Sequence, residues 1–125
     1  MPTEIMLLKN EEAGFHVLSS YENWRVAVSN LIEDEKPLSF EKHLETDEVF
    51  VLLKGQGFLL EAGTGKLPNA VKKVKMERNG VYNVPKGVWH AHQMKAGSRL
   101  LIVENADTGD KNSQKAPLIP YEMEM

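Results

Sequence analysis

The chain has 125 residues, 42% of them hydrophobic and 26% charged, and its formal net charge at pH 7 is -3. This length is enough to bury one core without disulfide or metal support, and the composition excludes wholesale disorder. The mildly acidic charge and the lack of a basic face exclude the electrostatic surface with which proteins bind nucleic acid. We therefore expect one folded domain over residues 1–125, with no nucleic-acid partner.

The sequence contains no cysteine, which excludes disulfides, thiolate metal ligands and a cysteine nucleophile. This absence is typical of proteins in a reducing compartment. The longest uninterrupted apolar run, residues 49–53, is too short to cross a bilayer. Residues 1–9 lack the basic and apolar segments of a secretory signal. We expect a cytoplasmic protein without a membrane partner.

Short runs of branched and aromatic residues follow one another along the chain, separated by Gly, Pro, Asn and Asp. No window shows a sustained helical period of apolar residues. Many short strands at regular spacing predict an all-β sandwich or barrel. The expected strands are 15–19, 24–31, 40–44, 48–53, 58–62, 71–76, 81–84, 88–94 and 100–104.

Two polar residues outside the main clusters lie in or near the first strands. Alternation places Trp24, Val26 and Val28 on one face of their strand and Arg25 on the other. Arg25 would anchor an anionic substrate if that face were internal, but a solvated side chain is the favoured interpretation. His16 is expected at the surface.

The third and fourth expected strands carry carboxylates and a histidine. Glu41 and His43 are two residues apart, so both side chains leave the same face of a strand. Simple alternation would put Glu48 on the opposite face, but the polar stretch 45–47 indicates a bend that resets the phase. Glu48 then shares a face with Phe50, where an unpaired charge would be costly. This placement favours a bound metal or another partner for Glu48.

Two strands, residues 49–53 and 100–103, are apolar on both faces. A strand of this kind needs cover on each side. The internal core supplies one cover, and a second subunit would supply the other, so we expect a homodimer. The alternative is that residues 5–8 of the same chain fold over the outer face.

A second polar cluster follows the turn formed by Pro85 and Gly87. On the next strand His90 and His92 share one face. His43, Glu48 and His90 together offer two imidazoles and a carboxylate, a donor set that holds a divalent metal and leaves positions open. Iron, manganese, zinc, nickel and copper all tolerate this set. His92 is favoured as a pocket residue rather than a ligand.

Two further regions are less informative. Tyr82 precedes the second cluster, and packing is the favoured role over hydrogen bonding in a pocket. Residues 106–116 are polar and rich in turn formers, which predicts a loop. The tail, residues 117–125, is expected to be extended, packing as a strand or bridging to a partner.

Over residues about 20–105 the chain resembles a small single-domain cupin. Glu41-Lys-His43, Glu48 and Gly55 are similar to the first family motif, a pair of histidines followed by a glutamate and a glycine, with Glu41 in place of the first histidine. Pro85-Lys-Gly87-Val-Trp-His90 is similar to the second. The resemblance implies a jelly roll, or double-stranded β-helix, with a metal inside. The chain departs from the family pattern at four places: Glu35, Asn79, Met94 and Glu41.

The departure at Glu41 bears on the metal site. A carboxylate in place of an imidazole hardens the site and favours iron(II), manganese or zinc. Glu41 would then be a fourth ligand; alternatively His92 replaces the lost nitrogen, or Glu41 binds substrate. The expected function is a metal-binding cupin that acts on a small organic molecule as a dioxygenase, isomerase or decarboxylase, with Glu41 or His92 moving protons. The alternatives are a sugar- or metabolite-binding cupin without turnover, and a structural dimer with a vestigial site.

Overall fold

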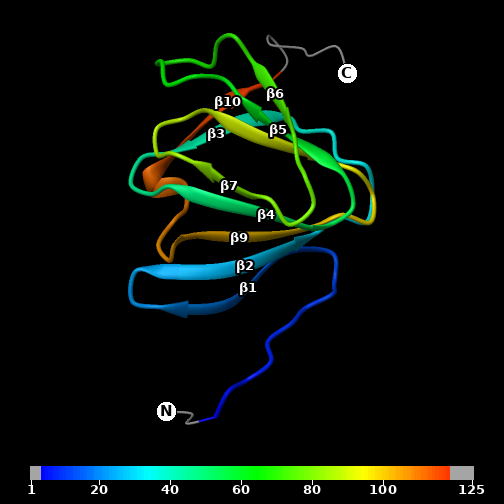
Figure 1. The fold of residues 1–125 in the computed structure, drawn as a ribbon. Helices are drawn as coiled ribbons and strands as arrows, with labels where there is room; N and C mark the ends of the chain where they lie inside the picture. The colour runs from blue at the N-terminus through cyan, green and yellow to red at the C-terminus, as the bar shows by residue number, and fades with distance from the viewer. Residues whose placement is uncertain (1–3, 119–125) are drawn as a thin grey trace.

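The computed structural model describes residues 4–118 and folds them into two antiparallel sheets of five strands each (Figure 1). Sheet A has the order β1 (Gly14–Tyr21), β2 (Trp24–Asn30), β9 (Arg99–Asn105), β4 (Glu48–Lys54) and β7 (Val81–Val84). Sheet B has the order β10 (Ser113–Pro117), β3 (Ser39–His43), β8 (His90–Met94), β5 (Gly57–Glu61) and β6 (Lys72–Lys75). From β2 onward the chain passes repeatedly from one sheet to the other, which is jelly-roll topology. The all-β prediction is confirmed.

The nine expected strands are present, each with ends within two residues of the prediction. The predicted loop 106–116 is wrong in its second half, because a turn of 3-10 helix, Asp110–Asn112, leads into β10. β10 is a polar edge strand that pairs with β3 along its whole length. An edge strand with exposed side chains does not need apolar alternation, so its composition resembles that of a loop. Residues 119–125 of the expected tail lie outside the described residues.

The main core lies between the sheets. Phe50 and Leu52 from sheet A pack with Leu59 and Met94 from sheet B, and all four are almost fully buried. Leu60, which follows Leu59 in β5, points to the outer face of sheet B. There it packs with Trp89 in a second cluster. Among residues 4–118, no helix has the length and apolar composition needed to cross a membrane.

The second cluster is closed by the loop between β5 and β6. The indole Nε1 of Trp89 donates to the carbonyl of Gly65 at 2.9 Å. Lys42 donates to the same carbonyl at 3.1 Å and lies 4.7 Å from the centre of the Trp89 ring. These contacts fix the loop over sheet B, so the outer face of this sheet is partly covered by its own chain.

The turn that leads from β4 in sheet A to β5 in sheet B depends on Gly55. Its φ is +91°, and a Cβ at this position would lie 2.6 Å from the Cα of Ser98. We expect Gly55→Ala to lower the free energy of unfolding by about 2–4 kcal/mol, because a left-handed alanine and a backbone clash add. Gly97→Ala is the matched control: its φ is +82° and nothing lies within 4 Å of the added methyl. Urea denaturation of both variants tests this, and equal losses would show that the clash is relieved without cost.

Candidate metal centre

Three buried side chains from three strands meet at one end of the sandwich. His43 ends β3, Glu48 begins β4 and His90 begins β8, and their exposed fractions are 5%, 7% and 6%. The predicted break between β3 and β4 is present, but it carries the chain from sheet B to sheet A, so Glu48 meets His43 across the interior of the sandwich. Asp47 holds the bend, because its carboxylate accepts the backbone N–H of Lys86 at 2.9 Å.

The contacts within this group are short and converge on one oxygen. Oε1 of Glu48 lies 2.9 Å from Nε2 of His43 and 2.9 Å from Nε2 of His90. One ligand atom from each residue lies within 4.8 Å of the others, a grouping that could hold a metal ion. The structure therefore brings together the three residues that the sequence nominated as ligands.

In each histidine, Nδ1 is the ring nitrogen that does not contact Glu48. The hydrogen bond of Nδ1 determines whether Nε2 can donate or accept. Nδ1 of His90 lies 3.0 Å from the carbonyl oxygen of Val88, which only accepts, so this nitrogen carries a proton. In the neutral ring the lone pair is then on Nε2, facing a carboxylate oxygen that is also an acceptor. Two acceptors at 2.9 Å need either a second proton on His90 or a cation between them. Nδ1 of His43 bonds to the hydroxyl of Ser113 at 2.8 Å, so β10 orients that ring.

The electrostatics of the group favour the charged forms. Burial alone would raise the pKa of Glu48, but hydrogen bonds from His43 and His90 outweigh it and hold the pKa well below its ordinary value. Burial would lower the pKa of His43, but Glu48 in particular outweighs it, and the pKa is raised. Glu48 is therefore an anion that attracts positive charge, whether protons or a metal.

The group lies in the wall of a cavity of about 400 Å³, which also receives Glu41, His92 and Arg25. Glu41 lines the cavity with a side chain that is 40% exposed, and its Oε1 is 3.7 Å from Nδ1 of His43. It is not part of the close three-residue group. Its roles as fourth ligand, proton carrier or substrate contact stay predictions.

His92 is paired with a carboxylate that the sequence did not assign to the site. Nδ1 of His92 lies 2.7 Å from Oε1 of Glu35, which also accepts the backbone N–H of Met94 at 3.1 Å. Burial would lower the pKa of His92, but Glu35 outweighs it and the pKa is raised. Glu35 stood out in the sequence only as a departure from a motif glycine. Its pairing with a residue 57 positions away left no local signal.

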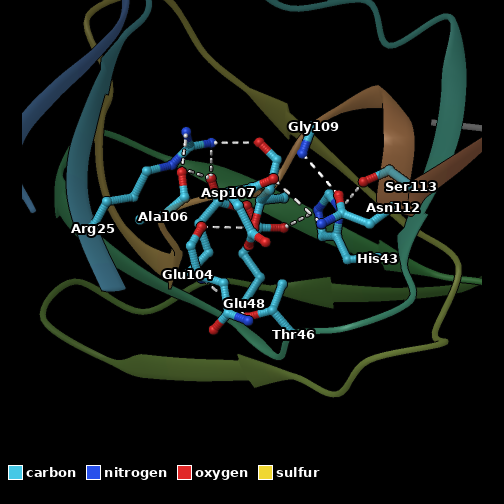
Figure 2. A network of polar contacts seen from close by, with 12 residues as sticks. Arg25, His43, Thr46, Glu48, Glu104, Ala106, Asp107, Gly109, Asn112 and Ser113 are labelled. Atoms are coloured by element: carbon cyan, nitrogen blue, oxygen red, sulfur yellow. Dashed lines mark hydrogen bonds and ion pairs between the residues drawn. The ribbon is translucent and has the colours of Figure 1, made fainter. Parts of the chain in front are cut away.

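The expectation of a solvated Arg25 is wrong. Arg25 lines the cavity, its Nε donates to Glu104 at 3.0 Å, and Nη2 donates to the carbonyl of Thr108 at 3.2 Å. Figure 2 shows the side chain pointing toward Glu104 and Ala106. The alternation along β2 was correct, but the valine-bearing face is the outer one, so Arg25 is on the inner face.

Glu104 links this ion pair to the histidine group. Burial raises its pKa to about 7, the charge of Glu48 adds to this, and Arg25 partly offsets it. Glu104 is a second cavity residue for which the sequence held no signal, because β9 was identified only as an apolar strand.

Two other sequence assignments can be compared with the structure. His16 is half-buried, lies outside the group and contacts the carbonyl oxygens of Glu12 and Ala13. Tyr82 packs against the core between the sheets, and its hydroxyl accepts the backbone N–H of Glu77 at 2.6 Å. The structure therefore confirms packing as the role of Tyr82.

The jelly-roll topology, with a histidine–glutamate group inside one end of the sandwich, defines a small cupin-like protein. A cupin superfamily protein of Desulfitobacterium hafniense has a TM-score of 0.57 and 16% identity, over 82% of this chain and 84% of that one. A Streptomyces PAC13 variant with uridine has a TM-score of 0.63 and 8% identity, over 89% and 84%. KdgF from Halomonas sp. has a TM-score of 0.57 and 10% identity, over 85% and 91%.

These likenesses confirm the predicted cupin fold. Pac13 is described as a nucleoside dehydratase. No protein-family model matches the sequence, and no curated protein matches it. At such low identity the likeness concerns the fold alone, so the function has to be argued from the residues in the cavity.

Proposed function

We propose that this protein binds one divalent cation through Nε2 of His43, Nε2 of His90 and the carboxylate of Glu48. The observation that carries the proposal is the pair of acceptors formed by His90 Nε2 and Glu48 Oε1, 2.9 Å apart with Nδ1 of His90 already committed to a carbonyl. A metal ion removes this conflict without a second proton. Iron, manganese, zinc and nickel all accept two imidazoles and a carboxylate, so the metal's identity stays open.

The cavity beside the group is the proposed site for a small organic molecule. Its volume of about 400 Å³ fits a molecule of metabolite size. Phe15 offers an apolar ring, and Glu41 offers an exposed acceptor for hydroxyl groups. The PAC13 structure with uridine supports a small hydroxyl-bearing ligand for a protein of this fold.

We infer that the reaction moves protons on this molecule. His43, Glu48 and His90 would hold a divalent metal that, when bound, would supply Lewis-acid polarisation of a carbonyl or hydroxyl oxygen and so make a neighbouring proton more acidic. Glu35 accepts the Nδ1 proton of His92 and so leaves Nε2 of the neutral ring as a base. Glu41 is the second candidate for proton transfer. This chemistry places isomerisation or elimination ahead of oxygenation in the proposal.

A solvent-exchange experiment tests the proposed reaction. Untagged protein is loaded with Mn²⁺ or Zn²⁺, and uridine and small sugars are followed by NMR in D₂O. We expect wild type to bind a hydroxyl-bearing compound and to exchange or eliminate one of its protons. His92→Asn should lower the rate about 100-fold or more at unchanged metal content. Binding without exchange would instead identify a metabolite-binding cupin. Absence of both ligand binding and metal uptake would identify a vestigial site.

Two further expectations belong to this proposal. The cytoplasmic location rests on the lack of cysteine and stays a prediction. We also propose a homodimer, supported by the apolar side chains that β4 and β9 direct away from the core. Sedimentation of the full chain at micromolar concentration measures its mass.

A further inference from the structure

The outer face of sheet A is an apolar surface with a polar rim. Cross-strand pairing places Val26, Val103 and Val49 in one row. The next row runs Val28, Leu101, Val51 and Val81 across four strands. The inward neighbours of these residues, among them Phe50 and Ile102, belong to the core between the sheets. The two rows contain no charged residue.

Exposure along the second row increases toward β7. Val28 is 2% exposed, Leu101 and Val51 are half-buried, and Val81 is 70% exposed. Polar residues continue the rows: Asn83 stands beside Val49, and Arg99 pairs with Asn30 beyond the second row. An apolar centre within a polar rim is the arrangement of a protein–protein interface.

The N-terminal segment is anchored at the same rim through Asn10. The carbonyl of Asn10 accepts the side-chain amide of Asn30 at 2.8 Å and Nη2 of Arg99 at 3.0 Å. Beyond this anchor, Ile5 is 103% exposed and Leu7 is 83% exposed. Figure 1 shows this blue segment extending away from the two sheets. The alternative expectation, that residues 5–8 fold over their own sheet, is therefore wrong.

We propose that residues 5–8 of one copy lie across the outer face of sheet A of a second copy, and that the exchange is reciprocal. One chain carries both an exposed apolar arm and an apolar face whose exposure increases toward β7, and Asn10 anchors the arm at the rim of that face. A two-fold axis beside that rim places each arm on the other copy's face, so the contact closes as a dimer. The lack of charge in the two rows makes a highly charged partner the poorer fit. The inference rests on the homodimer and is independent of the metal chemistry.

The lack of native cysteine permits a direct crosslinking test. Leu7→Cys and Leu101→Cys are prepared as separate variants, mixed and oxidised, and the linked peptides are identified by mass spectrometry. We expect disulfides between position 7 of one copy and position 101 of the other. Leu7→Cys mixed with Lys75→Cys, an exposed position on sheet B, is the matched control and should give at least ten times less product.

Two further measurements separate the possible outcomes. In a chain carrying both Leu7→Cys and Leu101→Cys, a disulfide that forms within one chain at high dilution would overturn the exchange. A variant without residues 1–8 should dissociate at least ten times more readily in sedimentation, with metal content unchanged. An unchanged dissociation constant would overturn the role of the arm while leaving the homodimer, and a monomeric full chain would overturn both.

Discussion

His90→Ala is expected to weaken binding of Zn²⁺ or Mn²⁺ by more than about 100-fold. Removing only an outer hydrogen-bond partner of a ligand commonly costs 10–100-fold, and this change removes a proposed ligand itself. The remaining pair, His43 and Glu48, can still bond to each other at 2.9 Å, so the cavity wall should stay intact. Calorimetric titration of metal-free protein, with circular dichroism to verify folding, measures the effect.

His16→Ala is the matched control for this experiment. His16 lies outside the group, and its Nε2 contacts the backbone carbonyls of Glu12 and Ala13 just before its own strand. Its replacement should leave the affinity within about twofold. Equal affinity of wild type and His90→Ala would show that His90 is not a ligand, and the proposed centre would be withdrawn.

The meeting of His43, Glu48 and His90 could be predicted because each depends on a local pattern. Side-chain alternation placed the residues within their strands, and the polar stretch 45–47 indicated a break between β3 and β4, which in the structure is the crossing from sheet B to sheet A. The resemblance to cupin motifs then brought the two strand ends together. Whether the three residues bind a metal is a separate matter that these patterns do not decide.

The pairs around the centre could not be predicted in this way. His92 and Glu35 are 57 positions apart, and Arg25 and Glu104 are 79 apart. Neither pair repeats along the sequence, so only the folded register brings its members into contact. Ser113 was missed for another reason, since its edge strand has the composition of a loop.

The error at Arg25 has a physical cause that connects the cavity with the outer face. The pattern of β2 separates apolar from polar side chains, and burial is normally the fate of the apolar set. Here the inner face carries Arg25 because a buried carboxyl group, that of Glu104, accepts its hydrogen bonds in the cavity. Val26 is left on the outer face, which needs cover from outside the domain. An interface on the outer face of β2 would give that face an apolar pattern. Such a pattern leads to the wrong placement of Arg25 on the outside.

The stability of the metal-free protein is expected to fall as the pH rises from 5.5 to 8. The pKa of Glu104 is raised to about 7 in the folded state from 4.5, so in this range the folded chain keeps a proton that the unfolded chain has lost. His43 and His92 have raised pKa values as well; their contribution is complete below 6.5 and is lost as the pH passes the folded value. The pKa of Glu48 is lowered, so its contribution is constant above its unfolded value. Together these shifts predict a loss of about 2–3 kcal/mol.

Metal should reverse this dependence. Metal binding requires neutral imidazoles, so the affinity for metal rises with pH. It rises over the same pH range in which the metal-free protein loses stability. At a free Zn²⁺ concentration well above the dissociation constant, the added stability grows as the logarithm of their ratio, and the loaded protein should be at least as stable at pH 8 as at pH 5.5. Chemical denaturation with and without Zn²⁺ at both pH values measures the two slopes. Glu104→Gln should remove most of the metal-free slope, because Glu104 alone accounts for about 2 kcal/mol of the loss, while keeping the reversal. Parallel slopes with and without metal would mean that protons and metal do not compete for His43 and His90.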